Sequence, residues 1–307
     1  MFDVAIIGLG AAGYTAAIYA ARYKLSTLLV GAEEGGMGVT AAEVGNWPGD
    51  IEISGPDLME KMKKHAQSFT EVSHKNLLVA QVEKTKAGFT LRYESGGSDE
   101  ARTIIFATGS KKRKLGVPGE AEFAGKGVSY CATCDGFFYR GKTVAVVGGG
   151  DAAVEGAAII AQVAKQVYLI HRRKELRAEP FWSQKLKEKT NVTFVLERTL
   201  KEIKGDQKVT GVILDQPFEG SNTLKLDGVF IEIGSSPSTE VAQALGCALD
   251  DRGYLKVNEA LETSVRGAFA AGDVSGGSNH FAQFVTAAGE GAVAVSGVFG
   301  FLQEHGA

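Results

Sequence analysis

Short apolar runs alternate along this chain with longer segments in which apolar residues recur at helical spacing. The short runs, of about four to eight residues, predict buried strands at 3–7, 26–30, 77–82, 89–93, 103–106, 143–147, 166–170, 192–196, 209–215 and 228–233. The longer segments predict helices over 12–23, 57–68, 152–164 and 283–300. Strands that alternate with helices predict an α/β fold with parallel sheets.

Two of the predicted strand-to-helix junctions carry a glycine-rich turn. The first reads Gly-Leu-Gly-Ala-Ala-Gly at 8–13, and the second reads Gly-Gly-Gly-Asp-Ala-Ala at 148–153. Glycines at such a junction let the backbone approach a pyrophosphate, which lies at the positive end of the helix. The two turns therefore predict two Rossmann-like nucleotide-binding domains and two dinucleotides.

The residues that follow the second strand of each predicted nucleotide-binding unit differ in charge. In the first unit the acid that usually holds a ribose is displaced, because Gly31 comes before Glu33, and we expect Glu33 to reach the ribose. In the second unit cationic and imidazole groups replace the acid, namely His171, Arg172, Arg173 and Arg177. Guanidinium groups suit a phosphate better than a hydroxyl, which predicts NADP(H), although a solvated helix start would show the same residues.

A pair of cysteines, Cys131 and Cys134, is followed directly by Asp135. This spacing allows a tight disulfide, and the acid is placed to exchange a proton with the thiols. Half of a zinc site has the same spacing, but a structural zinc needs about four ligands, and the rest of the chain offers Cys247 and five scattered histidines. We interpret the pair as redox-active, with zinc binding or inert thiols as the alternatives.

The net charge, the apolar runs and the cysteine count limit the partners and the compartment that we expect. The net charge of −3 gives no reason to expect nucleic acid or an anionic membrane as a partner. The chain starts without a basic segment, and we expect no apolar run long enough to span a bilayer. Three cysteines, two of them in a redox-type pair, fit a reducing compartment, so we expect the cytoplasm.

Two linkers divide the chain. The basic run at 111–114 is interpreted as a solvated first crossing between domains, and the serine-rich segment at 235–238 as the second. We therefore expect one discontinuous domain over 1–112 and 243–307, with a second domain inserted at 113–242.

The motifs and their order resemble those of the low-molecular-weight thioredoxin reductases over nearly the whole length. Besides the two turns they are Asn-Trp-Pro-Gly, Ala-Thr-Gly, Cys-Ala-Thr-Cys-Asp-Gly-Phe-Phe, His-Arg-Arg-x-x-x-Arg and Ala-Gly-Asp-Val. The resemblance implies that electrons pass from NADPH to FAD, to the Cys131–Cys134 disulfide and then to thioredoxin. It also implies a homodimer, FAD on the discontinuous domain and NADPH on the inserted one.

The resemblance carries site residues onto this chain. The implied FAD contacts are Gly8, Gly10, Ala11, Ala12, Gly13, Gly31, Glu33, Gly36, Met37, Asn46, Val82, Thr108, Gly109, Gly272, Asp273, Ala282 and Gln283. The implied NADPH contacts are Gly148, Gly150, Asp151, Ala152, His171, Arg172, Arg173 and Arg177. Phe137 and Phe138 match aromatic residues that receive thioredoxin.

Three departures from the family pattern lie in the expected FAD domain. Met37 stands where the family has Gln, Gly45 where it commonly has Glu, and Ala282 where it commonly has Arg. They leave open a related enzyme with another donor, such as ferredoxin, or another acceptor, such as a small disulfide or a peroxidase partner. A flavin redox sensor without turnover is the remaining alternative.

Overall fold

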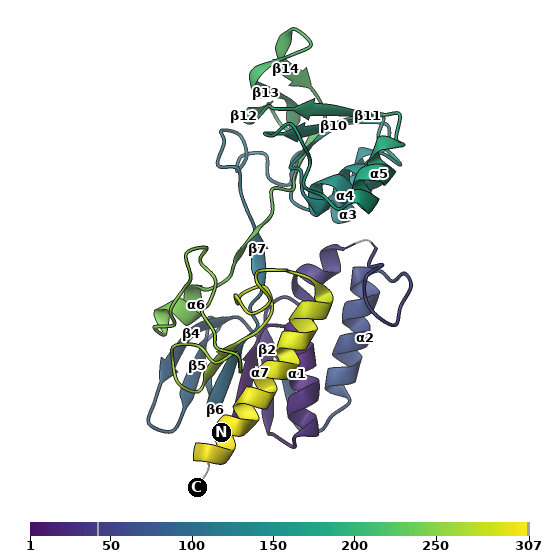
Figure 1. Ribbon diagram of the computed structural model, residues 1–307. Coiled ribbons are helices and arrows are strands. Elements are labelled where there is room, and N and C mark those ends of the chain that lie inside the picture. The colour runs from purple at the N-terminus through teal and green to yellow at the C-terminus, as the bar shows by residue number, and fades with distance from the viewer. Residues whose placement is uncertain (42, 306–307) are drawn as a thin grey trace. The chain divides into compact units, whose positions relative to one another are not determined.

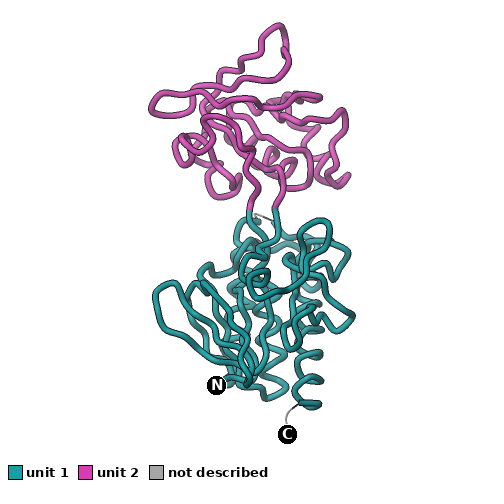
Figure 2. Tube along the Cα trace, turned by 90° about the vertical axis from the view of Figure 1, so that its left-hand side faces the viewer, with its two compact units in different colours: residues 1–111, 236–307 teal, residues 112–235 magenta. Residues whose placement is uncertain are grey.

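The computed structural model describes residues 1–41 and 43–305, and it divides the chain into two compact units (Figure 2). Unit 1 comprises residues 1–111 and 236–307, and unit 2 comprises residues 112–235. Residues 236–242, which we expected in the inserted block, are part of unit 1. The chain passes between the units through β7 (Ser110–Lys112) and β16 (Ser235–Pro237), which pair with each other.

The sheet of unit 1 explains why its chain can be interrupted. The strand order is β3-β2-β1-β6-β5-β4, in which the first four strands are parallel and β4 and β5 are antiparallel. The short strand β17 pairs in parallel with β6 and so returns the C-terminal segment to the sheet. The strands are β1 (Phe2–Ile7), β2 (Thr27–Gly31), β3 (Val72–Asn76), β4 (Val79–Lys84), β5 (Phe89–Tyr93), β6 (Ser98–Phe106) and β17 (Ala268–Ala270).

Three helices gather on one face of this sheet, namely α1 (Ala11–Arg22), α2 (Gly55–Gln67) and α7 (Phe284–His305) (Figure 1). Their apolar faces form one core with the sheet, because alternate strand residues point to this side. Side chains on the other face of the sheet form a second core with α6 (Glu240–Ala244) and with Cys247, Leu255 and Val274. Between β2 and α2 the chain forms the short 3-10 helix η1 (Gly36–Thr40), which contacts α2.

Helix α7 corrects one expectation from the sequence. It has 22 residues and a mean hydropathy of 1.5, so among the described helices it is long and apolar enough to cross a membrane. Its inner face is nevertheless buried against α1, and the buried residues include the charged Glu290. A buried acid and a close contact with a neighbouring helix are features of a core helix.

Unit 2 is built on a parallel sheet with the order β11-β10-β9-β15-β8. Helices α4 (Asp151–Ile160) and α5 (Pro180–Lys187) pack on one face of it. A separate antiparallel sheet of β12 (Leu200–Gly205), β13 (Val209–Phe218) and β14 (Ser221–Lys225) packs on the other. The strands of the parallel sheet are β8 (Val128–Ser129), β9 (Thr143–Val147), β10 (Gln166–His171), β11 (Val192–Leu196) and β15 (Gly228–Ile231).

The sequence missed elements whose apolar signal is weak. Strands β3, β12 and β14 consist largely of polar residues and bury few side chains, namely Leu200 and Ile203 of β12 and Leu224 of β14. Helix α5 has Leu186 as its single buried residue. Helix α4 ends at Ile160 instead of residue 164, and α7 continues five residues beyond 300 to His305.

We expect Gly291 to be required for the packing of α7 on α1. A Cβ at Gly291 would lie 2.4 Å from the Ala12 carbonyl oxygen, so Gly291→Ala must push the helices apart. The expected cost is about 1–3 kcal/mol in the free energy of unfolding. Gly289 in the same helix has open space around its Cβ position, so Gly289→Ala should stabilise by about 0.5–1 kcal/mol. Thermal unfolding of both variants tests this, and equal midpoints would contradict it.

Candidate active site

The glycine turn of unit 1 is closed on its inner side and open on its outer side. A Cβ at Gly8, which has φ +129°, would lie 2.0 Å from the Ala107 carbonyl oxygen, and one at Gly13 would lie 1.9 Å from the Gly8 carbonyl oxygen. A Cβ at Gly10 would meet nothing within 4 Å. Gly10 also precedes α1 without a side-chain cap, so the first N–H groups of the helix face this open space.

Residues that are far apart in the sequence meet around this turn. The Asn46 side-chain amide donates to Gln283 Oε1 at 3.0 Å, which joins two of the expected FAD contacts. A Cβ at Gly272, which has φ +77°, would lie 2.9 Å from the Ala12 Cβ. Thr108 donates to the Ser238 carbonyl oxygen at 2.7 Å. The C-terminal segment therefore completes the surroundings of the first turn.

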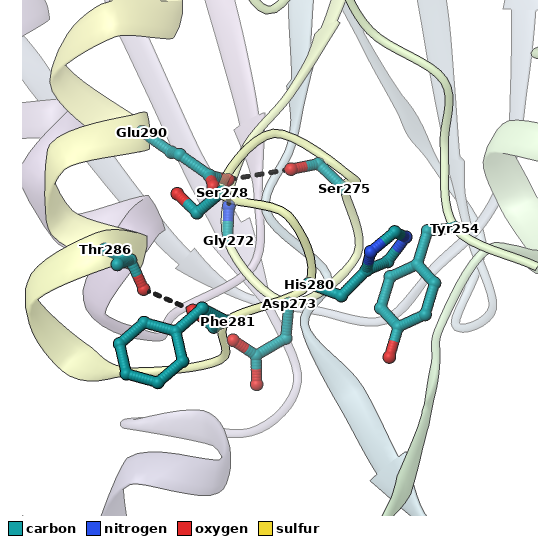
Figure 3. A pocket seen from close by; sticks show the side chains of 9 residues that line it. All are labelled: Tyr254, Gly272, Asp273, Ser275, Ser278, His280, Phe281, Thr286 and Glu290. Atoms are coloured by element: carbon teal, nitrogen blue, oxygen red, sulfur yellow. Dashed lines mark hydrogen bonds between the residues drawn. The ribbon is translucent and has the colours of Figure 1, made fainter. Parts of the chain in front are cut away.

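Asp273 lies in the loop between β17 and α7, beside a small pocket shown in Figure 3. Burial raises the pKa of Asp273, and a hydrogen bond from Ser110, 3.3 Å away, opposes this shift. The loop itself is held by Glu290, which accepts hydrogen bonds from Gly272 N and from Ser275 Oγ, each at 2.7 Å. Glu290 and Ser275 were missed in the sequence, where the one usable signal was an acid inside an apolar helix.

The remaining expected FAD contacts differ in how they are placed. Glu33 is exposed just after β2, whereas its neighbour Glu34 is bound to Lys63 and Asn76. Met37 lies in η1, where its carbonyl oxygen accepts from Thr40, and Ala282 is exposed before α7. Val82 is buried in the core as part of β4, so its side chain is enclosed by the protein itself.

The turn of unit 2 repeats the arrangement of unit 1. A Cβ at Gly148, which has φ +150°, would lie 2.1 Å from the Glu232 carbonyl oxygen, and one at Gly149 would lie 2.3 Å from the His171 ring. Gly150 faces open space and precedes α4 without a side-chain cap. Asp151, the first residue of α4, accepts from the Glu179 backbone at 2.7 Å.

The cationic residues after β10 are tied to this turn. Arg172, Arg173 and Arg177 are all exposed, and the backbone N–H of Arg177 donates to the Gly149 carbonyl oxygen at 2.6 Å. His171 is buried, and burial lowers the pKa of its imidazole. Among the described residues the His171 Nε2 has no hydrogen-bond partner. The guanidinium groups are thus available to an anion, while His171 supports the turn from beneath.

Cys131 and Cys134 form a disulfide at the start of the short helix α3 (Ala132–Asp135). The Cys134 backbone N–H donates to Cys131 Sγ at 3.1 Å, and Ser129 Oγ contacts both the N–H and the carbonyl of Cys131. Asp135 is partly exposed in the same turn. The pair is therefore accessible and firmly held by backbone contacts.

An exposed aromatic surface follows the disulfide in the 3-10 helix η2 (Gly136–Tyr139). Phe137 is 67% exposed and Phe138 is 81% exposed, which is far more than aromatic residues of this size usually show. In contrast, Tyr139 of the same turn packs edge-on against Phe230 of β15. The sequence placed both phenylalanines as partner-binding residues, and their exposure is compatible with that prediction.

The third cysteine and the histidines do not complete a zinc site with this pair. Cys247 is buried, its Sγ lies 3.5 Å from Thr263 Oγ1, and burial raises the pKa of its thiol. No group of three or more histidine, cysteine or acidic side chains that could hold a metal ion is found in residues 1–41 and 43–305. The sulfurs that zinc would need are joined to each other.

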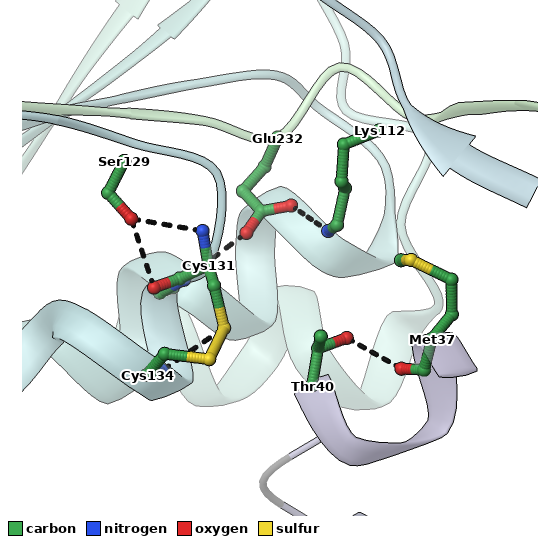
Figure 4. The surroundings of a disulfide bond; sticks show 8 residues. Met37, Thr40, Lys112, Ser129, Cys131, Cys134 and Glu232 are labelled. Carbon is green, nitrogen blue, oxygen red and sulfur yellow. Dashed lines mark hydrogen bonds and ion pairs between the residues drawn. A yellow bond between two sulfur atoms is a disulfide. The ribbon is translucent and has the colours of Figure 1, made fainter. Parts of the chain in front are cut away.

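A buried ion pair beside the disulfide was missed in the sequence (Figure 4). Glu232, at the end of β15, binds Lys112 at 2.5 Å and accepts from the Ala132 backbone N–H at 3.3 Å. The signal that could have found it is the acid itself, which interrupts the apolar run from Val229 to Ile233.

Taken together, each unit offers a nucleotide cradle, and unit 2 adds a disulfide. Open space at Gly10 and at Gly150, against uncapped N-termini of α1 and α4, fits the pyrophosphate of a dinucleotide in both units. A disulfide can accept two electrons and return them to another disulfide by exchange. The arrangement can therefore support electron transfer from a nucleotide to sulfur.

Comparison with known proteins gives concordant matches. The sequence pattern of the pyridine nucleotide-disulphide oxidoreductases matches residues 2–291. A thioredoxin reductase of Escherichia coli O157:H7 is 44% identical over 303 residues, which is 94% of this chain and 92% of that protein. A glucosaminate ammonia-lyase of Pseudomonas fluorescens is also 44% identical, over 95% of this chain and 92% of that protein. The crystal structure of Lactococcus lactis thioredoxin reductase superposes with a TM-score of 0.93 at 36% identity and covers 99% of this chain and 100% of that one.

Proposed function

The chain belongs to the pyridine nucleotide-disulphide oxidoreductase family, among the low-molecular-weight thioredoxin reductases, and we propose that it reduces a thioredoxin with electrons from NADPH. The family implies a flavin and a pyridine nucleotide, which we assign as FAD on unit 1 and NADPH on unit 2. We further propose that the protein is a homodimer and that it acts in the cytoplasm. The molar mass in solution is the first check of the dimer.

The observation that carries this proposal is the disulfide Cys131–Cys134, which unit 2 holds beside its own nucleotide turn. Sequence identity alone does not fix the reaction, since the lyase from Pseudomonas fluorescens is as similar as the reductase from Escherichia coli. A closed, accessible disulfide followed by an acid and exposed aromatic residues is what disulfide exchange with a protein partner requires.

The residues that would hold each nucleotide are those that fit a pyrophosphate and its sugar. For FAD these are the turn at 8–13, Glu33, the Asn46–Gln283 pair and Asp273, while Arg172, Arg173 and Arg177 would hold the 2′-phosphate of NADPH. When bound, the nicotinamide supplies a hydride and the flavin converts it into the electron pair that a disulfide accepts. Asp135 would give a proton to the departing thiolate and take it back when the disulfide re-forms.

A different electron donor is the main alternative, since Met37 and Ala282 depart from the family pattern in unit 1. The three exposed arginines argue against it, because they offer the cationic contacts that the 2′-phosphate of NADPH needs. A small disulfide as the acceptor is opposed by the exposure of Phe137 and Phe138, which favours a protein partner.

An anaerobic titration with NADPH tests the proposed function. The wild type should take up about two electron pairs per chain, one that bleaches the flavin and one that opens the disulfide. Cys134→Ser should take up one pair, because its flavin is reduced and no disulfide remains. Bleaching by dithionite without bleaching by NADPH would show that the donor is another molecule.

Alanine substitutions at Gly10 and Gly150 should show which turn binds which nucleotide. Gly10→Ala should lower the ratio of FAD to protein, and Gly150→Ala should raise the KM for NADPH roughly tenfold or more, which corresponds to about 1.4 kcal/mol of binding. Neither Cβ meets protein atoms within 4 Å, so both variants should fold normally. Each variant is the control for the other, and an effect of Gly10→Ala on NADPH binding alone would reverse our assignment.

Removing the acid of Asp135 should impair disulfide exchange with the partner. Asp135→Asn should slow reoxidation of the dithiol by a bacterial thioredoxin roughly a hundredfold, the usual scale of general acid–base catalysis. Flavin reduction by NADPH in stopped flow should stay as in the wild type. Asp206→Asn, the same change at an exposed turn of unit 2, is the control, and unchanged reoxidation of Asp135→Asn would exclude the role.

A further inference from the structure

Glu232 is a buried acid for which nucleotide binding and disulfide exchange, as described so far, have no use. It follows the fully buried strand β15, and its own exposure is 5%. A carboxylate in such a place is costly unless it is paired and hydrogen-bonded. Because a buried carboxylate is costly, we expect Glu232 to have a role other than packing.

Both carboxylate oxygens of Glu232 have defined partners (Figure 4). Oε2 lies 2.5 Å from the Lys112 ammonium, whose side chain is 20% exposed. Oε1 accepts the backbone N–H of Ala132 at 3.3 Å. Burial raises the pKa of Glu232, while Lys112 and the Ala132 N–H oppose that shift by favouring the ionised form. The geometry is that of an ammonium–carboxylate pair with one oxygen aimed at the redox helix.

The Ala132 N–H belongs to the peptide that joins Ala132 to Cys131, so the carboxylate lies one peptide unit from the redox pair. The main chain of Glu232 also borders the nucleotide turn, because its N–H donates to Val147 at 2.8 Å and its carbonyl oxygen lies against Gly148. Helix α4 packs at the same place, because a Cβ at Gly156 would lie 2.8 Å from the Ala132 Cβ and 3.9 Å from Glu232 Cγ. Glu232 therefore connects the nucleotide turn to the disulfide within unit 2.

We propose that Glu232, ionised and paired with Lys112, is a positioning residue for the redox pair that keeps the Cys131 sulfur protonated after the disulfide is reduced. This inference rests on the proposed function and assigns a residue to it. Reduction adds two electrons and two protons to the disulfide to give two thiols, or two electrons and one proton to give one thiol and one thiolate. The charge of Glu232 favours the first outcome.

The reason is electrostatic. Cys131 Sγ accepts the Cys134 N–H at 3.1 Å, an arrangement that by itself would stabilise a thiolate. A negative charge next to the same backbone segment opposes a second negative charge on the sulfur. A dithiol that is not stabilised as a thiolate gives its electrons away more readily, since stabilising the reduced form is what makes a disulfide strongly oxidising. The charge of Glu232 thus favours the donation of electrons from the dithiol to a partner.

The other ionisable groups on the elements that pack around Cys131 contribute to the same balance. They are Asp135 of α3, Tyr139 of η2, and Asp151 and Glu155 of α4. Burial raises the pKa of Tyr139, so it stays neutral. The three acids carry the same sign as Glu232, which leaves Lys112 as the cation that contacts its carboxylate.

The test measures the pKa of Cys131 directly in the FAD-loaded full chain. In a Cys134→Ser background, the rate of alkylation by iodoacetamide is followed against pH by mass spectrometry. Glu232→Gln keeps an oxygen that can accept the Ala132 N–H but removes the charge, and it should lower the pKa of Cys131 by at least about one unit. The double variant Lys112→Met/Glu232→Gln removes both charges and should lower the pKa by less than Glu232→Gln alone, because the Lys112 charge, which favours a thiolate, is also gone.

Two further variants separate charge from structure. Glu240→Gln breaks the exposed pair with Lys111, the neighbour of Lys112, and should leave the pKa of Cys131 unchanged. Glu232→Ala removes both charge and acceptor, so a role confined to holding α3 would change Glu232→Ala and spare Glu232→Gln. That pattern would overturn the proposal, as would equal titration of all variants. The measurement needs neither NADPH nor thioredoxin, so its failure is distinct from failure of the proposed function.

Discussion

Both nucleotide turns depend on one contact, in which a glycine lies directly against a carbonyl oxygen on the adjacent strand. In unit 1 Gly8 lies against Ala107 after β6, and in unit 2 Gly148 lies against Glu232 after β15, with no room for a Cβ in either case. This contact brings the turn down onto the carboxyl end of the sheet and points the first N–H groups of α1 and α4 outward. The open cradles at Gly10 and Gly150 are its consequence.

The same constraint explains how much the sequence could predict. A turn that tolerates no side chain must be glycine in the sequence, so both cradles, their strands and their helices were predictable from local pattern. The disulfide pair and the exposed phenylalanines were predictable in the same way, since each is a continuous motif. The assignment of FAD to the interrupted domain and of NADPH to the inserted domain stays a prediction.

What could not be predicted rests on contacts between distant positions. Glu232 and Lys112 are 120 residues apart, and Asn46 and Gln283 are 237 apart, so no local period connects either pair. Strands β12 and β14 were missed because a sheet with one solvated face carries half of the apolar signal. Glu290 was missed because its role depends on the Gly272 loop, whose backbone N–H it accepts, and that loop is distant from it in the sequence pattern.

The placement of Glu232 limits how unit 2 can work. Its backbone borders the nucleotide turn and its side chain holds the segment of the disulfide, so the two functional parts of unit 2 are joined through one residue. The disulfide and the nucleotide turn are therefore tied together inside unit 2, which the chain enters at β7 and leaves at β16. Lys112 is the last residue of β7, so the ion pair that sets the charge beside Cys131 is anchored at that crossing.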